Sequence, residues 1–303
     1  MVAAQRVMVV GGAGFVGSHL VERLVLEPLE VDVVDDLSTG ALAHLSGARN
    51  AQGRFKFQNI AVESAEFGEL VSLRRPETIV NVASFSPAAA HLRGALASLQ
   101  AVTAVLEAAR LSGVGKVVTV LPASLLYGEV SARDTPIKEG HLSEPRTSEE
   151  VVARAAADMH VVYRDRHGVE FTVLAVGNVY GPRQRPEDGV VAAFADALAA
   201  GRAPVVHGTG KQTRDFVHVD DVVDALVRSL DRAGGLVVNV GTGISTSINE
   251  LWDTMGGASS PAPRTASARP NDLARLALSP TRARIQLGWS PFTSLRDGLA
   301  RLR

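Results

Sequence analysis

Short apolar segments alternate with longer amphipathic ones along the first half of the chain. The apolar runs rich in β-branched residues are expected to be strands, at 7–10, 31–34, 55–60, 77–83, 116–121 and 171–176. Helical patterns such as SLQAVTAVLEAAR separate these runs. Continuously apolar strands that alternate with helices are typical of a parallel sheet covered on both faces. The pattern therefore predicts an α/β protein with a doubly wound parallel sheet.

After about Ala175 the rhythm changes to shorter pieces rich in glycine and proline. Examples are GNVYGPRQRPEDG, VVHGTGKQTRDF and VVNVGTG. Such segments are typical of loops that carry binding residues on a rigid scaffold. We therefore expect a main domain over 1–175 and a smaller substrate-binding domain over 176–303, with part of 205–240 returning to the main sheet.

Composition narrows the classes of function. The 303 residues carry a formal net charge of -1 and no cysteine. Disulfides, thiolate nucleophiles and cysteine metal sites are thereby excluded. The balanced charge gives no general attraction to nucleic acid or to an anionic membrane. No run approaches the roughly 20 apolar residues of a membrane span, and the first residues lack the core of a signal peptide, so we expect a cytoplasmic protein without nucleic-acid or membrane partners.

The first strand leads into the segment GGAGFVGSHLVERL, which places Gly11, Gly14 and Gly17 between a strand and an amphipathic helix. Glycines at this spacing allow a tight turn and a close approach of backbone to a pyrophosphate at the helix N-terminus. Asp35 ends the second strand, 18 positions after Gly17, where it can accept hydrogen bonds from ribose hydroxyls and repel a 2′-phosphate. We interpret the segment as a Rossmann site for NAD; the alternative is that the glycines serve only a tight turn.

Further cofactor contacts are expected wherever the chain leaves the carboxyl end of a strand. They fall in the first turn of the glycine-rich helix and after the second, third and fourth strands: Phe15, Val16, Asp36, Asn59, Ile60, Val82, Ala83 and Ser84.

The glycines together with VVDDLSTG, NVYGPRQ, GTGKQTRDFVHVDDV, NVGTG and LGWSPFTSLRDGL resemble the extended short-chain dehydrogenase/reductase family, in particular its nucleotide-sugar epimerases and dehydratases. The resemblance runs almost from end to end. It implies a bound NAD that transiently oxidises the sugar of a nucleotide-diphosphate sugar held by the second domain. It also implies that Asn178 contacts the sugar nucleotide, that Arg214 and Arg269 grip the diphosphate, and that Asp272 meets a ribose or orients an arginine. The alternative for Arg214 and Arg269 is that they only form surface ion pairs.

The catalytic residues of that family are replaced. The resemblance places its tyrosine at Glu149, its lysine at Ala153 and its serine or threonine at Ala123, beside Ser124. No YxxxK occurs anywhere in the chain. The altered positions lie around the nicotinamide and the reacting sugar, whereas the adenine and diphosphate ends look retained.

Three hypotheses follow. The first is a divergent epimerase or dehydratase-like enzyme in which Glu149, with Ser124, takes part in proton transfer. The second is a catalytically inactive protein that binds NAD or a nucleotide sugar, in which Glu149 and Glu150 only favour the N-terminal dipole of a helix capped by Thr147 or Ser148. The third is a different reaction on the same scaffold, with His91 or Ser124 as its residues.

The oligomeric state follows from the resemblance alone. The family often forms homodimers by packing two helices of the first domain into a four-helix bundle. The helix around Leu96 to Leu111 and the helix after Pro145 are the candidates here, although core packing within the monomer would produce the same pattern.

Overall fold

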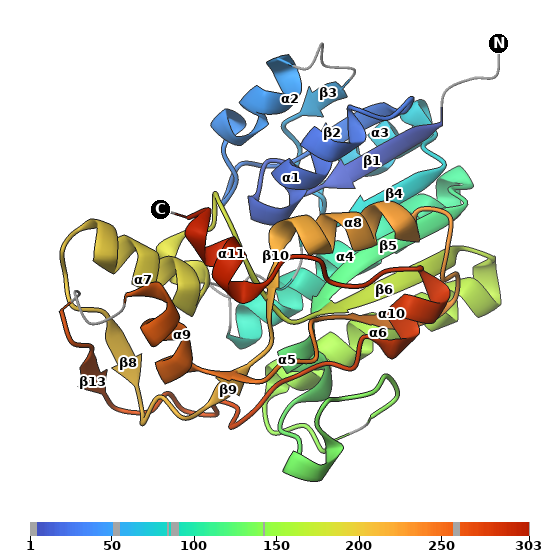
Figure 1. Cartoon of the computed structure of the whole chain (residues 1–303). Helices are drawn as coiled ribbons and strands as arrows, with labels where there is room; N and C mark the ends of the chain where they lie inside the picture. Colours follow the sequence, from blue (N-terminus) through green and yellow to red (C-terminus); the bar gives the residue numbers. More distant parts are fainter. Residues whose placement is uncertain are drawn as a thin grey trace.

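The computed structural model describes residues 5–50, 55–83, 85, 91–141, 143–256 and 261–302. Its centre is a parallel sheet with the strand order β11-β6-β5-β4-β1-β2-β3 (Figure 1). Helices cover both faces, so the predicted doubly wound α/β fold is confirmed. The strands of this sheet are β1 (Arg6–Val10), β2 (Glu30–Val34), β3 (Phe55–Gln58), β4 (Thr78–Asn81), β5 (Lys116–Pro122), β6 (Glu170–Val176) and β11 (Leu236–Val240).

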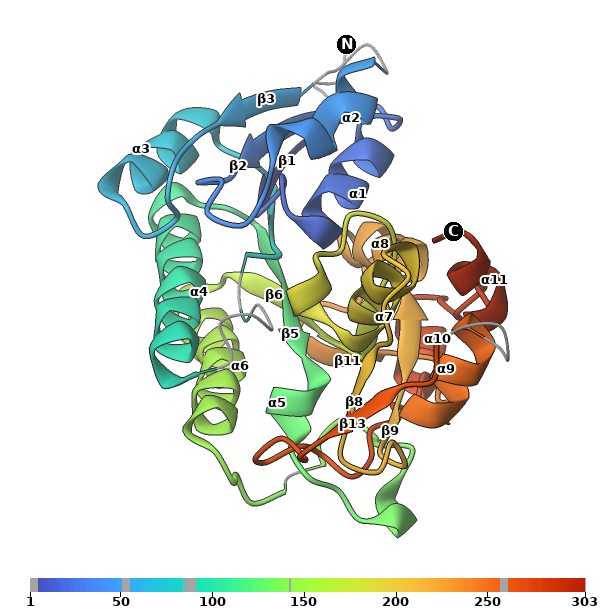
Figure 2. The same ribbon diagram turned by 90° about the vertical axis from the view of Figure 1, so that its left-hand side faces the viewer.

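Alternate residues of each strand face opposite layers, which explains why the strands are apolar throughout. In β1, Met8 and Val10 belong to one buried cluster, whereas Val7 and Val9 belong to another on the opposite face. The first cluster lies under α3 (Ala65–Arg74), α4 (Leu92–Ser112) and α6 (Ser148–His167), and the second under α1 (Phe15–Leu24) and α8 (Val219–Ser229) (Figure 2). All six strands predicted from apolar runs are present. A seventh, β11, extends the sheet beyond β6 in parallel register, with Leu236 opposite Thr172.

A smaller, loop-rich part sits beyond the carboxyl ends of the sheet strands (Figure 1). It has its own apolar cluster, in which Phe194 and Trp252 meet edge to face with ring centroids 5.6 Å apart. Its elements are β7 (Asn178–Tyr180), α7 (Val190–Ala199), β8 (Val205–His207), β9 (Thr213–Arg214), β10 (Phe216–His218), β12 (Thr246–Ser247), α9 (Ile248–Met255), β13 (Arg264–Ala266) and α11 (Leu295–Ala300). The remaining helices are α2 (Ser46–Asn50), α5 (Ala123–Tyr127) and α10 (Thr281–Gln286), with 3₁₀ turns at Leu42–Leu45, Ala132–Asp134 and Pro186–Asp188.

The start of α6 shows how its two adjacent glutamates differ. Thr147 is the N-cap, and its hydroxyl accepts the N–H of Glu150 at 3.2 Å. The carboxylate of Glu150 is buried and accepts the N–H of Arg146 at 2.8 Å. The first bond satisfies one of the free N–H groups at the helix start, and the second fixes the chain just before the cap. Glu150 therefore serves the cap, and Glu149 lies on a more exposed side of the first turn.

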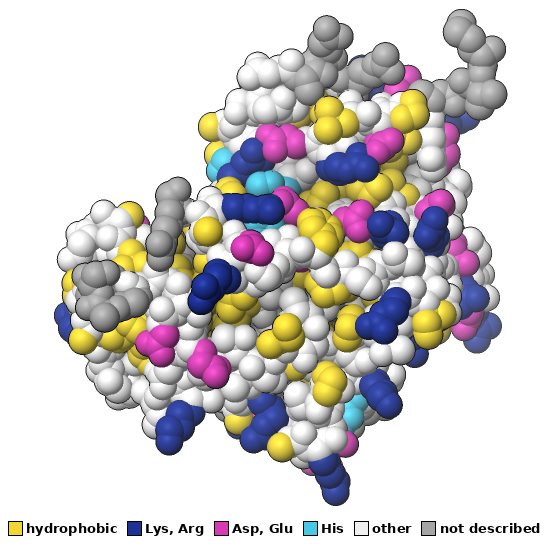
Figure 3. All heavy atoms as spheres, viewed as in Figure 1, with side chains coloured by type: hydrophobic (Ala, Val, Ile, Leu, Met, Phe, Trp, Pro, Cys, Tyr) yellow, Lys and Arg dark blue, Asp and Glu magenta, His cyan; other side chains and the backbone are white. Residues whose placement is uncertain are grey.

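On the face shown in Figure 3, basic and acidic side chains are interspersed rather than gathered into patches of one sign. Within the described ranges, no helix is long and apolar enough to cross a membrane. The same ranges contain no group of three or more His, Asp or Glu side chains arranged to hold a metal ion.

His160 is a fully buried titratable group between α6 and the sheet. Its Nε2 lies 2.7 Å from the hydroxyl of Thr119 on β5, and its Nδ1 lies 2.7 Å from the carbonyl of Ala156. Burial lowers the pKa of His160 to about 4 from an ordinary value of 6.5. The imidazole is therefore neutral in the folded protein at pH 5, whereas it is mostly protonated in the unfolded chain.

The stability that His160 confers should be complete above pH 6.5 and should be lost as the pH falls towards 4. Between pH 7 and pH 5 we expect the wild-type free energy of unfolding to fall by about 2 kcal/mol more than that of His160→Gln. Urea denaturation at several pH values measures both slopes. His167→Gln, which alters an exposed histidine of the same helix, should keep the wild-type slope; equal slopes for wild type and His160→Gln would contradict the assignment.

Candidate functional site

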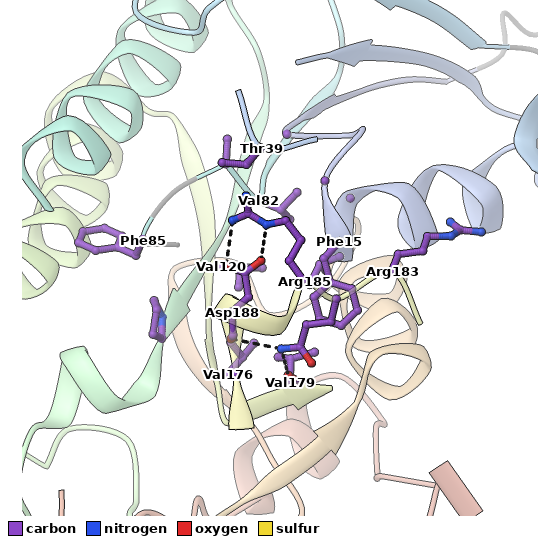
Figure 4. Close-up of a pocket in the computed structure, with 18 of the residues that line it drawn as sticks. Phe15, Thr39, Val82, Phe85, Val120, Val176, Val179, Arg183, Arg185 and Asp188 are labelled. Carbon is purple, nitrogen blue, oxygen red and sulfur yellow. Dashed lines mark hydrogen bonds and ion pairs between the residues drawn. The ribbon is translucent and has the colours of Figure 1, made fainter. Parts of the chain in front are cut away.

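A cavity of about 370 Å³ opens at the carboxyl ends of the sheet strands, between the sheet and the loop-rich part (Figure 4). One wall is formed by the segments that follow β1, β2, β3, β4 and β5. The opposite wall is formed by the segment 176–191, which contains β7 and the start of α7. Open parallel sheets bind their ligands at this edge. The cavity therefore brings the glycine-rich turn and the NVYGPRQ segment to one place.

The glycine-rich turn depends on missing side chains. Gly11 has a φ of +81°, and a Cβ on it would lie 2.9 Å from the backbone of Ala83. A Cβ on Gly17 would lie 2.0 Å from the carbonyl oxygen of Gly11. No side chain caps α1 at Gly14, so the N–H groups of its first turn are open to an anion. The turn thus has the close backbone approach and the helix N-terminus that a dinucleotide pyrophosphate requires.

Asp35 closes the adenosine end of this wall. Its carboxylate accepts the N–H groups of Ala13 and Leu37, both at 2.8 Å. Burial raises the pKa of Asp35, and these hydrogen bonds oppose that rise. Two carboxylate oxygens offer about four acceptor positions, so capacity remains for ribose hydroxyls. Asp36 also lines the cavity and fixes Ser38, whose hydroxyl donates to it at 2.6 Å.

Most of the other expected cofactor residues lie on this wall as well: Phe15, Val16, Ile60, Val82 and Ala83. Asn59 is exposed and is not among the lining residues, and Ser84 lies outside the described residues. The contacts of individual residues with a cofactor remain predictions. The backbone and the acidic strand end together fit NAD.

The positions at which the resemblance expects the family's catalytic groups are apolar or lie outside the cavity lining, apart from Ser124. Ala123 and Ala153 are both fully buried. Ser124 lines the cavity. Glu149 is not among the lining residues, and its carboxylate accepts the hydroxyl of Ser148 at 3.2 Å. Of the two expected catalytic residues, the structure thus brings only Ser124 to the cavity wall.

No tyrosine or lysine lines the described part of the cavity. The three phenols have partners elsewhere: Tyr127 donates to Asn239 at 2.6 Å, Tyr163 to Glu107 at 3.0 Å, and Tyr180 to the carbonyl of Leu295 at 3.5 Å. Burial raises the pKa of Tyr127 and that of Tyr180, which disfavours a phenolate at either position. None of the three tyrosines therefore reaches the described cavity wall in place of the one that the resemblance expects on α6.

Two residues near the fourth strand have structural partners. His91 is the N-cap of α4, where its Nδ1 accepts the N–H of Gly94 at 3.1 Å, and it is not a lining residue. Ser98 accepts the N–H of Phe85 at 2.9 Å. This bond helps to hold Phe85 in a left-handed backbone conformation, with φ of 57°, against the cavity. Phe85 is an apolar lining residue that the sequence patterns did not single out.

The expected substrate residues divide into two groups. Asn178 lines the cavity. Arg214, which is mostly buried, donates to the carbonyl oxygens of Thr213 and Leu273 at 2.8 Å each and forms an ion pair with Asp272. Arg269 is exposed. Arg214, Arg269 and Asp272 are not lining residues, so their contact with a diphosphate remains a prediction.

The segment between β7 and α7 supplies polar lining residues that sequence reasoning missed: Arg183, Gln184, Arg185 and Asp188. The signal was present in GNVYGPRQRPEDG, because charged residues in a loop rich in glycine and proline are typical of binding segments. The backbone conformation of the segment between β7 and α7 determines which of these charged side chains point into the cavity.

Comparison with known proteins gives the family. The model of the NAD dependent epimerase/dehydratase family matches residues 7–241. A UDP-glucose 4-epimerase from Mycolicibacterium smegmatis is 38% identical over 306 residues, which cover 98% of this chain and 96% of that protein.

Solved structures agree. A UDP-glucose 4-epimerase from Thermotoga maritima, determined with UDP-glucose, superposes with a TM-score of 0.90 at 31% identity and covers 98% of this chain and 97% of its own. A UDP-glucose 4-epimerase from Thermus thermophilus, determined in complex with NAD, gives a TM-score of 0.87 at 30% identity, with 99% of each chain covered.

The turn predicts a contrast between two glycine substitutions. Gly17→Ala should lower the free energy of unfolding by about 1–3 kcal/mol and weaken NAD binding, because its methyl group collides with the Gly11 carbonyl. Gly68→Ala on α3, where no atom lies within 4 Å of the new methyl group, should be neutral or stabilising by up to about 1 kcal/mol. Urea denaturation and titration with NAD measure both; unchanged NAD affinity in Gly17→Ala would contradict the role of the turn.

Proposed function

Because the chain belongs to the NAD dependent epimerase/dehydratase family, we propose that it binds a UDP-sugar beside NAD and changes the sugar without the family's usual catalytic residues. The observation that carries the proposal is the single cavity, whose walls combine the glycine-rich turn with Asn178 and the segment before α7. This arrangement suits a sugar held next to the nicotinamide. The UDP group is inferred from the relatives, which are UDP-glucose 4-epimerases.

NAD supplies a hydride acceptor and donor for the sugar carbon. The protein must then hold the sugar hydroxyl and accept its proton when a carbonyl forms. Ser124 is the hydroxyl on the cavity wall nearest in sequence to the family's position, and a serine can donate and accept a hydrogen bond at once. Glu149 remains the proposed carboxylate partner. In the present arrangement its side chain contacts Ser148, so this role requires a change of rotamer.

A second candidate function is a binding protein without turnover. The observations that favour it are the full burial of Ala123 and Ala153 and the absence of Glu149 from the described cavity lining. Such a protein would keep both ligands but lack a group that accepts the proton. A different reaction on the same scaffold, through Ser124, is the third.

An assay for conversion of UDP-glucose to UDP-galactose with added NAD tests these candidates. We expect conversion by the wild-type protein and a loss of about 10²-fold or more in kcat for Ser124→Ala and for Glu149→Gln, with NAD affinity unchanged. Ser131→Ala and Glu144→Gln, which alter exposed side chains, are the matched controls.

Each outcome selects one candidate. Full activity in Glu149→Gln would remove Glu149 from the mechanism and leave its carboxylate a role at the helix N-terminus. Binding of both ligands with no conversion across a panel of UDP-sugars would replace the enzyme with the binding protein. Conversion only of another substrate class, lost in Ser124→Ala, would favour the third candidate.

A homodimer is part of the proposal. Helices α4 and α6 pack side by side (Figure 2) and carry exposed apolar side chains, among them Leu96 at 50% and Val151 at 53% exposure. Pairing of two such helix pairs would bury this surface. The expectation of a cytoplasmic protein likewise remains a prediction.

Sedimentation velocity should give about twice the mass of one chain, and Leu96→Arg should shift the protein towards the monomer because it buries a charge in the helix interface. A monomeric wild-type protein at micromolar concentration would exclude the dimer. Leu111→Arg, near the far end of α4, tests how far the interface extends.

A further inference from the structure

Two arginines line the described part of the cavity, and they differ in what holds them. Arg183 donates to the hydroxyl of Ser18 at 3.1 Å and to the carboxylate of Glu22 at 2.7 Å, both on α1. In Figure 4 its side chain extends away from the centre of the cavity, along α1. Arg185 reaches the opposite way, into the space between Val82 and Phe15. Arg185 is therefore the guanidinium that faces a ligand.

The Arg185 side chain donates its hydrogen bonds to Asp188, and its Nη1 also forms a longer ion pair, at 3.5 Å, with the exposed carboxylate of Glu187. The Nε of Arg185 donates to Oδ2 of Asp188 at 2.8 Å, and its Nη2 donates to Oδ1 at 2.9 Å. The side chains of Arg185 and Asp188 are 30% and 13% exposed. The guanidinium and the carboxylate thus form a bidentate ion pair that lines the cavity. The carboxylate raises the pKa of Arg185 further above its ordinary value.

A phosphate presents the same pair of oxygens to a guanidinium as a carboxylate does. Asp188 therefore occupies the position that an anionic ligand group would take. Arg185 and Asp188 are three residues apart in the same loop, so breaking their ion pair disrupts only a local contact. The loop stays in place because Arg183 and the carbonyl of Pro182, 3.0 Å from Nε2 of His19, hold it to α1 from the other side.

We propose that Arg185 exchanges Asp188 for the diphosphate of a bound nucleotide, and that Asp188 is a built-in competitor that weakens nucleotide binding. The inference rests on the proposed function, since it assumes that nucleotides enter this cavity. The diphosphate belongs either to the UDP group or to NAD. The chemistry is the same for both, and the two sources can be tested separately.

The test is whether removal of Arg185 and removal of Asp188 change nucleotide affinity in opposite directions. Isothermal titration of the full chain with UDP and, separately, with NAD should show binding weakened about tenfold in Arg185→Ala, the loss expected for a charge-assisted hydrogen-bonded contact. Asp188→Asn should instead tighten binding of the same ligand by about threefold to tenfold, because the guanidinium no longer leaves a hydrogen-bonded carboxylate and keeps only the longer ion pair with Glu187. Arg185→Lys, which keeps the charge but not the fork, should fall between wild type and Arg185→Ala.

A purely structural ion pair would give a different result. Removal of either partner would then disturb the loop alike, so both variants would weaken binding or neither would change it, and either result would overturn the proposal. Arg202→Ala and Asp196→Asn, which alter an exposed arginine-aspartate pair at the end of α7, should leave binding unchanged. If Arg185→Ala weakens and Asp188→Asn tightens binding of UDP only, Arg185 is assigned to the UDP diphosphate. If the two variants have these opposite effects on NAD binding only, Arg185 is assigned to the dinucleotide. Failure of the wild-type protein to bind either ligand would overturn the proposed function, and this inference with it.

Discussion

The contact between Gly17 and the carbonyl of Gly11 determines where α1 begins, and most of the site depends on it. A methyl group at Gly17 would lie 2.0 Å from that oxygen, so the helix starts here only with glycine. From this start, α1 directs its N-terminal N–H groups at the cavity and its Ser18 and Glu22 at Arg183. The second wall is thereby held at a fixed place relative to the first. One backbone contact thus helps to place both halves of the cavity.

The same geometry explains why binding and chemistry can be altered independently. The groups that fit a dinucleotide are mainly backbone groups and Asp35, which do not depend on the side chains at the start of α5 and α6. Ala123 and Ala153 are packed into the core, where small apolar residues cost nothing in stability. Ser124, Asn178 and the loop before α7 supply polar groups to the cavity. Replacement of the catalytic set, as the resemblance implies it, therefore leaves an intact cavity with polar groups on both walls.

The sequence allowed the fold to be predicted because its signals are local and repeated. Each apolar run became a strand, and the glycine spacing located the α1 turn. The sequence offered Thr147 or Ser148 as the cap of α6, and the hydrogen bond from the N–H of Glu150 shows that Thr147 is the N-cap. The residues of the site could be predicted less completely. Arg185 and Asp188 pair across a turn that no periodic pattern encodes, and the left-handed conformation of Phe85 depends on a hydrogen bond that its N–H donates to Ser98 on α4. The resemblance pointed to Arg214 as a diphosphate ligand, but its hydrogen bonds to two carbonyl groups and its ion pair with Asp272 are properties of the folded chain.

The central claim is that this cavity holds NAD and a nucleotide sugar together although the family's catalytic side chains are absent. Mass spectrometry of the small molecules released when the purified protein is denatured tests it most directly. The account predicts NAD together with a nucleotide-diphosphate sugar, recovered with the protein or taken up when both are added. Recovery of neither, with no uptake on addition, would contradict it and would mean that the glycine turn serves the fold alone.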